Sequence, residues 1–268
     1  FAKLQKELPG EVFTTRTLAT YSYELNNKKA PFDNVNVRKA LNLSLDRNVI
    51  TDKVLGQGQT PTYVFTPTYI EEGHLIQQPA YSKEPMAQRN EEAIKLLEEA
   101  GYSKANPLKF SILYNTNENH KKVAIAAASM WKANTKGLID VKLENQEWKT
   151  YIDSRRAGRY DAARAGWNAD YNQATTFGNY FLSNSSNNTA KYANPEYDKA
   201  IAESYVATDA EGRAKAYAKA EEILAKDFGI VPIFNYVNPR LVKPYVKGYS
   251  GKDPQDHIYL RNLYIIKH

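Results

Sequence analysis

The spacing of apolar residues along the chain switches repeatedly between two periods. Over residues 18–25 every second residue is apolar, which predicts a strand with one buried face. Over residues 91–100 the apolar residues recur every three or four positions, which predicts an amphipathic helix that Gly101 caps. The same criteria predict further strands over 108–114, 139–143, 160–167, 230–236 and 241–246. They predict further helices over 33–45, 46–55, 119–134, 150–159, 196–206 and 210–225.

Helices separate most of these strands along the sequence. A helix between two strands carries the chain back to the same end of the sheet, so such strands run parallel. The order of elements therefore predicts the α/β class, with a mostly parallel central sheet flanked by helices. Residues 59–85 contain four prolines and no sustained period, so we expect a long irregular segment there.

The composition is ordinary for a folded chain, with 42% hydrophobic and 25% charged residues among 268. The net charge is +6, but the charges are interspersed, so no nucleic-acid partner is predicted. No apolar run approaches the roughly 20 residues of a membrane span. Cysteine is absent, which excludes thiol nucleophiles, disulfides and cysteine-type zinc sites.

The chain opens with FAKLQKELPG, which has the pattern of a helix end followed by a turn. We therefore expect this amino terminus to be a cut inside a larger protein. The 20 tyrosines outnumber the 9 phenylalanines. Because tyrosine combines apolar area with a polar tip, this ratio suits a wet, aromatic-lined ligand cleft.

Sequence signatures of common enzymes are missing. No glycine-rich phosphate loop, Gly-x-Ser-x-Gly motif or His-Glu-x-x-His motif occurs. The four histidines lie far apart in the sequence, so no metal site is predicted from them. His120 is interpreted either as a surface residue at the start of a helix or as a ligand-facing group. An enzyme such as a peptidase or a glycosidase is therefore the disfavoured interpretation.

The segment RAGWNAD, residues 164–170, has unusual chemistry for the end of a strand, because it gathers a cation, a tryptophan and an anion. In an extended backbone its even-numbered residues point one way and its odd-numbered residues the other. Gly166 has no side chain, so a ligand backbone could approach there and pair as an added strand. The plainer alternative is that Arg164 and Asp170 pair within the chain and that Trp167 belongs to the core.

Longer stretches of the chain resemble a known family. RAGWNADYN and the preceding NQEWKTYIDSRRAGRYD are similar to the peptide-binding half of periplasmic oligopeptide-binding proteins, the solute-binding subunits of peptide ABC importers. The resemblance runs almost end to end, through YSYELNN, FDNVNVRKALNLSLDR, EEAIKLLEEAGY, LYNTNENHKK, LSNSSNNTA, IVPIFNYVNPRLVKPYVKGYSGKDP and YIIKH. It implies a periplasmic-binding-protein-like lobe, with terminal segments that belong to another lobe.

The resemblance also implies a division of the chain. Residues 1–19 would be a fragment of a first lobe, residues 20–237 the peptide-binding third lobe, and residues 238–268 a returning segment of the first lobe. The strands near Thr20 and near residues 236–238 would form the hinge. The remainder of the full-length chain would then be the partner that closes over the ligand.

Individual ligand contacts follow from the same resemblance. Asp170 resembles the aspartate that pairs with a peptide α-amino group, and Arg164 resembles the arginine that meets the carboxylate of shorter peptides. His120 resembles the histidine that meets the carboxylate of slightly longer ones. Gly166 and Asn168 would supply backbone hydrogen bonds to the peptide main chain.

Further residues are implied to line side-chain pockets, with Trp148, Trp167 and Tyr236 as walls and Arg155 as polar lining. Position 55 is a leucine where the family pattern implies a lysine that serves longer peptides.

The function implied is capture of short oligopeptides through their backbone and termini, with little side-chain specificity. The peptides would be delivered in the periplasm to the membrane permease of an ABC importer, and no cofactor, metal or nucleic acid is implied. Two alternatives remain open from the residues. The chain could belong to a relative specialised for murein peptides, dipeptides or haem, or to a surface interaction module without a transport role.

Overall fold

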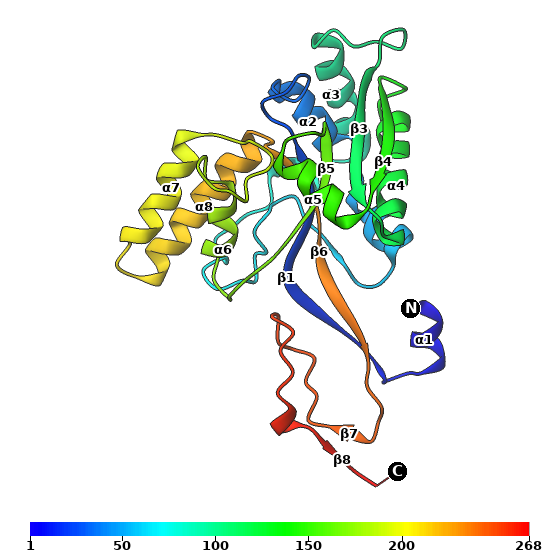
Figure 1. Ribbon diagram of the computed structural model, residues 1–268, viewed down its shortest axis with the longest axis vertical. Helices are drawn as coiled ribbons and strands as arrows, with labels where there is room; N and C mark the ends of the chain where they lie inside the picture. Colours follow the sequence, from blue (N-terminus) through cyan, green and yellow to red (C-terminus); the bar gives the residue numbers. More distant parts are fainter. Residues whose placement is uncertain (268) are drawn as a thin grey trace.

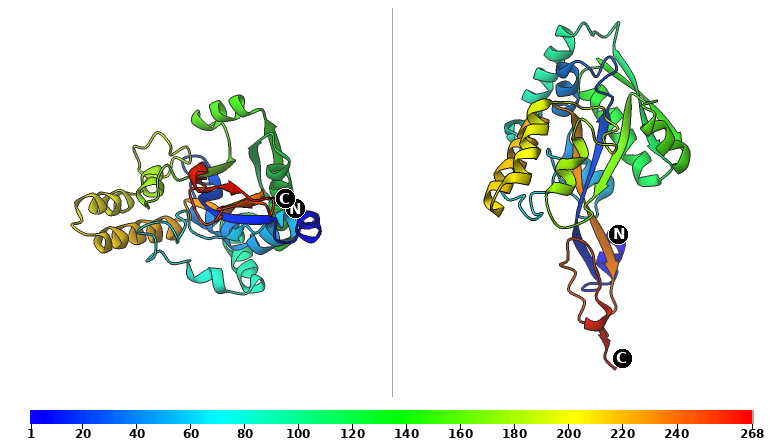
Figure 2. Two further views of the ribbon diagram at one scale, coloured as in Figure 1. Left: turned by 90° about the horizontal axis from the view of Figure 1, so that it is seen from below. Right: turned by 60° about the vertical axis from the view of Figure 1, so that its left-hand side comes forward.

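The computed structural model describes residues 1–267, which form a helix-covered body and a narrower arm (Figure 1). A six-stranded sheet with the order β2-β6-β1-β5-β3-β4 runs through the body. A separate two-stranded sheet, β7-β8, lies at the far end of the arm (Figures 1 and 2). The strands are β1 (Val12–Leu25), β2 (Thr60–Pro61), β3 (Leu108–Asn115), β4 (Ile139–Gln146), β5 (Ala162–Asn168), β6 (Ile230–Leu241), β7 (Val246–Lys247) and β8 (Tyr264–Ile265).

Helices lie on both sides of the large sheet. The α-helices are α1 (Ala2–Glu7), α2 (Val35–Leu43), α3 (Met86–Glu99), α4 (Glu118–Asn134), α5 (Trp148–Arg156), α6 (Thr175–Gly178), α7 (Pro195–Val206) and α8 (Ala210–Lys226). A π-helix spans Val49–Leu55, and short 3-10 helices span Ala80–Lys83, Asn179–Phe181 and Leu260–Asn262. Among the described residues, no helix is long and apolar enough to cross a membrane.

The α/β class with a helix-flanked central sheet is confirmed, but the prediction of a mostly parallel sheet is wrong. β3 pairs in parallel with β4 and β5, as the intervening α4 and α5 require. β1 pairs antiparallel with both β5 and β6, and β2 pairs antiparallel with β6. The sheet is mixed because β1 runs from the arm into the body, whereas β5 and β6 on either side of it run the other way.

Two large apolar clusters fill the body. One joins α2, α3 and α4 to the sheet around Trp131, which is fully buried and donates from its indole nitrogen to Leu41 O at 2.9 Å. The other joins α6, α7 and α8 around Phe177 and Phe181. These clusters hold the middle strands rigidly, so the ends of those strands can carry a site.

The amino-terminal ends of α4 and α5 fix the positions of His120 and Trp148. α4 begins at Glu118 because the Asn117 side chain accepts hydrogen bonds from the backbone N–H groups of Asn119 and His120. α5 begins at Trp148 because the Glu147 carboxylate accepts from Lys149 N at 2.9 Å. The sequence placed the start of α5 two residues later than this cap does.

β1 and β6 continue side by side out of the body and into the arm (Figure 1). Their pairing breaks between Arg16 and Thr20, where the register shifts. At this break Leu18 turns to other partners: its N–H donates to Pro254 O, and its carbonyl accepts from Ala169 N. The predicted separate strand over 241–246 is wrong, because β6 runs unbroken to Leu241 before the chain turns.

Candidate functional site

The sheet opens along one edge of β5. On one side β5 pairs with β1 from Ala162 to Asn168. On the other side β3 reaches only Ala162 and Ala163. Residues 164–168 therefore have one paired edge and one edge without a neighbouring strand, at the point where β5 leaves β3.

Backbone hydrogen bonds fix the direction of each residue's polar groups. Ala169 N donates toward β1, to Leu18 O, whereas the Arg164 carbonyl accepts from the Tyr151 hydroxyl of α5 on the far side. Neighbouring residues of a strand direct their N–H and C=O groups to opposite sides. Gly166 and Asn168 share the parity of Arg164, so their backbone groups face the open edge.

A cavity of about 590 Å³ adjoins this open edge. Its lining comprises Thr17, Leu18, Trp148, Arg164, Gly166, Asn168, Ala169, Tyr236, Asn238, Pro254, Gln255 and Asp256. The lining includes five of the residues that the family resemblance assigned to the site, namely Trp148, Arg164, Gly166, Asn168 and Tyr236. The opposite wall comes from the arm, through the loop that carries Pro254 to Asp256.

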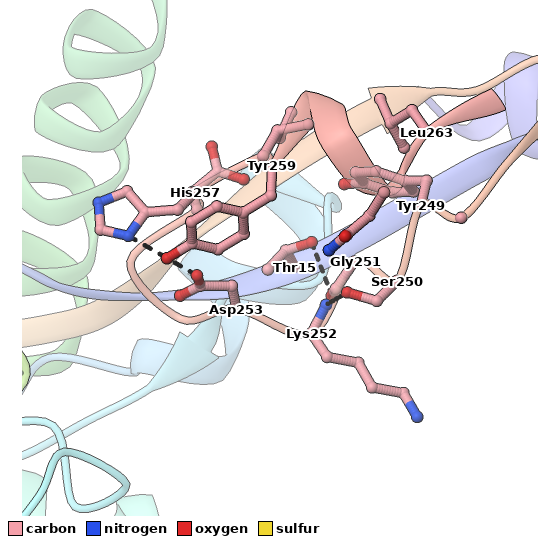
Figure 3. A pocket seen from close by; sticks show the side chains of 13 residues that line it. Thr15, Tyr249, Ser250, Gly251, Lys252, Asp253, His257, Tyr259 and Leu263 are labelled. Atoms are coloured by element: carbon pink, nitrogen blue, oxygen red, sulfur yellow. Dashed lines mark hydrogen bonds and ion pairs between the residues drawn. The ribbon is translucent and has the colours of Figure 1, made fainter.

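The arm loop is firmly attached beside the cleft. Arg240 and Asp256 form an ion pair, and Asn238 donates to the Asp256 carboxylate at 2.7 Å. A smaller hollow of about 120 Å³ lies behind the loop, where Thr15 Oγ1 donates to Gly251 O at 2.9 Å (Figure 3). No feature of the sequence pointed to this loop, because its role depends on contacts between distant segments.

Arg164 projects a half-buried guanidinium toward the cavity. It donates to the Tyr236 hydroxyl at 2.6 Å and lies over the Tyr21 ring, 5.2 Å from its centroid. Its Nε is buried and has no hydrogen-bond partner among the described residues. Burial alone would lower the pKa of Arg164, but the oxygens of Tyr236 and other tyrosines raise it. The site thus holds a permanent cation, and no described carboxylate forms an ion pair with it.

Asp170 provides the opposite charge at the other end of the segment. It is exposed, and among the described residues its carboxylate accepts one long hydrogen bond, from Thr176 Oγ1 at 3.5 Å. No lysine, arginine or histidine of residues 1–267 forms an ion pair with it. Among the described residues Arg164 pairs with a neutral hydroxyl and Asp170 with Thr176, so neither charge has an ionic partner. Neither Asp170 nor His120 lines the larger cavity.

His120 lines a second cavity of about 200 Å³, together with Leu55, Gln57, Asn119, Phe234 and other residues. Its Nδ1 is buried without a partner among the described residues. Burial, assisted by the nearby Arg164 cation, lowers the pKa of His120 to about 3. The imidazole is therefore neutral near pH 7 and can act as a hydrogen-bonding group rather than as a cation.

The two tryptophans of the site differ in environment. Trp148 is 54% exposed and lines the larger cavity beside the Tyr151 ring. Trp167 is half-buried, packs edge-on against Tyr180 at 4.9 Å and donates to Thr176 Oγ1. Trp167 lies on the face of the strand opposite to Arg164, as the alternation of strand side chains requires, and it belongs partly to the core.

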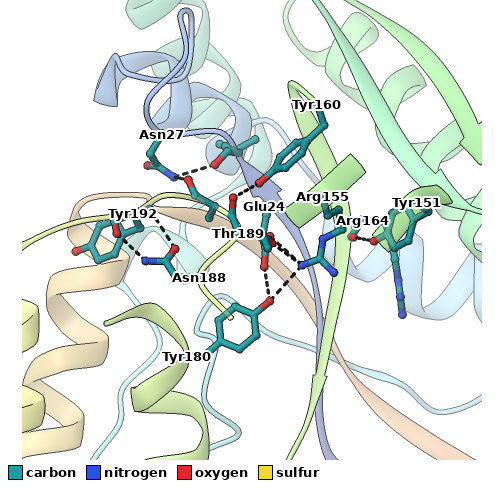
Figure 4. A network of polar contacts seen from close by, with 12 residues as sticks. Glu24, Asn27, Tyr151, Arg155, Tyr160, Arg164, Tyr180, Asn188, Thr189 and Tyr192 are labelled. Carbon is teal, nitrogen blue, oxygen red and sulfur yellow. Dashed lines mark hydrogen bonds and ion pairs between the residues drawn. The ribbon is translucent and has the colours of Figure 1, made fainter. Parts of the chain in front are cut away.

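Arg155 is not among the lining residues of either cavity, and its role as polar lining of a pocket stays a prediction. It is buried and forms an ion pair with Glu24 at 2.9 Å (Figure 4). Glu24 also accepts hydrogen bonds from the hydroxyls of Tyr180 and Thr189. Burial lowers the pKa of Arg155, but the Glu24 carboxylate outweighs it and raises the pKa well above its ordinary value. Glu24 and Tyr151 had no assigned role in the sequence, since only the fold brings them beside β5.

Comparisons with known proteins identify a family for this chain. The model of the bacterial extracellular solute-binding proteins, family 5 Middle, matches residues 1–189. A periplasmic oligopeptide-binding protein OppA from Haemophilus influenzae is 97% identical over 268 residues, which are 100% of this chain and 50% of that protein. A periplasmic murein peptide-binding protein MppA from Escherichia coli is 44% identical over 268 residues, which are 49% of its length.

Solved structures give the same relationship. The crystal structure of Haemophilus influenzae OppA in complex with the peptide RPPGFSPFR superimposes with a TM-score of 0.93 at 96% identity, over 100% of this chain and 52% of that one. The unliganded open form of the MppA murein tripeptide binding protein gives a TM-score of 0.90 at 43% identity. The chain spans about half the length of the curated relatives it matches. It belongs to the family 5 bacterial extracellular solute-binding proteins.

Proposed function

We propose that the full-length protein, meaning this sequence at the length of its curated relatives, binds short peptides along the open edge of β5. One observation carries the proposal. The backbone groups of residues 164–168 lack a neighbouring strand on the cavity side, between an unpaired cation and an unpaired anion. A peptide is an extended backbone with an anion at one end and a cation at the other, so it complements all three features.

Each terminus of the peptide has a partner in this proposal. The α-carboxylate lies against the Arg164 guanidinium, whose planar group forms two parallel hydrogen bonds with a carboxylate. The α-ammonium lies against Asp170. Gly166 and Asn168 contribute backbone hydrogen bonds, and His120 contacts the carboxyl end of longer peptides.

Side chains of the ligand contribute little to selection. Main-chain hydrogen bonds and paired termini are available to any peptide, whatever its sequence. Trp148 and Tyr236 provide aromatic walls, Trp167 backs them, and the roomy cavity leaves space for water to complete hydrogen bonds. The protein therefore captures peptides of varied sequence.

The rest of the full-length protein completes the trap. Residues 1–19 and 238–268 belong to a first lobe, and residues 20–237 form the lobe that carries the site. The register break near Thr20 is the hinge, where side chains replace the interrupted ladder. Closure over the peptide in the periplasm allows docking on the permease of an ABC importer. The protein carries out no catalysis itself and requires no cofactor, metal or nucleic acid.

Calorimetry on the full-length protein tests this proposal. Trialanine with free termini should bind, whereas N-acetyl-trialanine and trialanine amide should each lose affinity. The loss should be about 2–5 kcal/mol, the scale of breaking a buried charge pair. Equal affinity for free trialanine and for both blocked peptides would contradict the assignment. Mass spectrometry of co-purified ligands would distinguish general peptides from murein peptides.

The 268-residue chain by itself should bind trialanine weakly or undetectably, since half of the relatives' length is missing from it. The same titration on this chain checks the expectation, and tight binding would refute the role given to the remaining lobe.

A further inference from the structure

Asp170 is an exposed residue between two attachments of the chain. Before it, Ala169 N donates to Leu18 O, which ties the end of β5 to β1. After it, Ala174 N donates to Glu71 O at 3.0 Å. Asp170 and the three residues that follow it form no helix or strand. The position of the Asp170 carboxylate therefore depends on what holds these four residues.

A loop of residues 70–74 holds this segment from outside. Glu71 N donates to Asn172 Oδ1 at 3.2 Å, and Glu72 Oε2 accepts from Gln173 Nε2 at 3.0 Å. The contacts of Glu71 use its backbone, so they do not depend on its side chain. The contact of Glu72 uses the carboxylate, so it depends on the type of residue at this position.

Both partners in the contact between Glu72 and Gln173 are held by further bonds. The other carboxylate oxygen of Glu72, Oε1, accepts from Arg213 Nε of α8 at 2.7 Å, and the two side chains form an ion pair. The Gln173 side-chain carbonyl accepts from Thr175 Oγ1 at 2.6 Å. Because Arg213 balances the charge of Glu72, this carboxylate does not compete with Asp170 for an ammonium group.

The backbone of Glu72 has an unusual conformation. Its φ is 64°, in the left-handed region that residues other than glycine rarely adopt. Glycine would occupy this position without steric cost. Strained residues persist where the surrounding contacts hold them, and they cluster at functional sites. The Glu72 side chain supplies such contacts and is only 9% exposed, so the conformation points to a role for the carboxylate.

We propose that Glu72 is a positioning residue for the recognition of the peptide ammonium. This inference rests on the proposed function. Through Gln173, Glu72 holds residues 170–173 so that the Asp170 carboxylate stays near the end of the open strand edge. Glu72 does not touch the ligand. It reduces the range of positions of the Asp170 carboxylate before the peptide arrives, and such preorganisation increases affinity.

Two variants of the full-length protein remove the same bond from opposite sides. Glu72→Ala should weaken the binding of trialanine about fivefold, the net scale of one hydrogen bond. N-acetyl-trialanine has no ammonium for Asp170, so its affinity should change much less. Gln173→Ala leaves the ion pair of Glu72 with Arg213 intact and should give the same selective loss. The double variant should lose no more than either single variant, because both side chains act through one bond. Calorimetry with the two peptides measures these effects.

Glu211→Ala is the matched control. It removes a carboxylate of α8 that pairs with His74 at 3.2 Å, and this pair connects the same loop to the same helix. Among the described residues, the Glu211 carboxylate has no hydrogen bond to residues 170–173. Both peptide affinities should therefore stay unchanged. The same selective loss in Glu211→Ala would assign the effect to the attachment of the whole loop and refute the role of Glu72.

Two other results would also overturn the inference. If Glu72→Ala and Gln173→Ala weaken both peptides equally, or weaken neither, Glu72 does not act through Asp170. The proposed function would still stand in that case, provided that the wild-type protein prefers trialanine to N-acetyl-trialanine. If the wild-type protein binds the two peptides equally, the assignment of Asp170 in the proposed function fails, and the role of Glu72 fails with it.

Discussion

Two arginines beside the same strand have opposite environments. Arg155 meets Glu24 at 2.9 Å inside a network of hydroxyls (Figure 4). Among the described residues the Arg164 guanidinium meets a tyrosine hydroxyl and an aromatic face, but no carboxylate. Both are arginines on neighbouring elements, so residue type does not distinguish them. The carboxylate of Glu24 balances the charge of the first within the chain. The second has no carboxylate partner among the described residues, so an external anion can take that place.

Whether a buried charge has an ionic partner within the chain separates charges that stabilise the fold from charges that can bind a ligand. A buried pair is costly to break because one partner is left charged and desolvated. An unpaired charge at a cavity costs the free protein stability, which a ligand then offsets. Changes around Glu24 should therefore affect stability first, and changes around residues 164–170 should affect peptide affinity first.

The largest effect is expected at the paired arginine. Glu24→Ala leaves Arg155 buried without its carboxylate, so the free energy of unfolding of the full-length protein should fall by about 3–5 kcal/mol. Chemical denaturation measures it. Lys219→Ala is the control, since it breaks an exposed pair with Glu203 that is worth about 0–1 kcal/mol. If Glu24→Ala and Lys219→Ala lowered the free energy of unfolding equally, Arg155 could not be called a structural charge.

Asp170→Ala should act in the opposite way. The residue is exposed and unpaired, so the unfolding free energy should change little. The affinity for trialanine should fall by about 2–5 kcal/mol, because the peptide ammonium loses its partner. Calorimetry and denaturation on the same preparation give both quantities. An unchanged dissociation constant would rule out the contact with the ammonium.

Gly166→Ala should have an intermediate effect. The added methyl group has to push apart Arg164 and Tyr236, and overpacking of this kind costs about 1–3 kcal/mol. Both neighbours are the far ends of flexible side chains, so the cost should appear as weaker trialanine binding rather than as unfolding. A loss confined to thermal stability, with binding intact, would count against the proposed position of the peptide.

The effect that is smallest at neutral pH is that of His120, because it develops only on acidification. The pKa of His120 is about 3 in the folded protein, against an ordinary value of 6.5. Between these values the unfolded chain binds a proton that the folded chain does not, so acidification lowers the free energy of unfolding across that window. His120→Asn should reduce this slope. Denaturation curves at several pH values above and below 5 measure it, and identical slopes would show that His120 does not contribute.

Much of the local structure follows from the sequence. The periods of apolar residues identified the strands over 18–25 and 108–114 and the helices over 91–100 and 119–134, because each depends on which face is buried. The predicted starts of helices were less accurate than their existence. The start of α5 is set by a hydrogen bond to the Glu147 side chain, and the spacing of apolar residues carries no information about such a bond. The unusual segment 164–170 was visible because its charges do not suit a strand.

Only the tertiary structure decided the rest. The direction of β1 and β6 in the sheet depends on how the arm joins the body, and no local pattern encodes this. The pairing of Arg155 with Glu24 joins distant segments, so the sequence could not separate it from Arg164. The sequence determined which residues carry charge near the end of β5. The fold decided which of those charges are satisfied, because a partner from a remote strand is available to one arginine and not to the other.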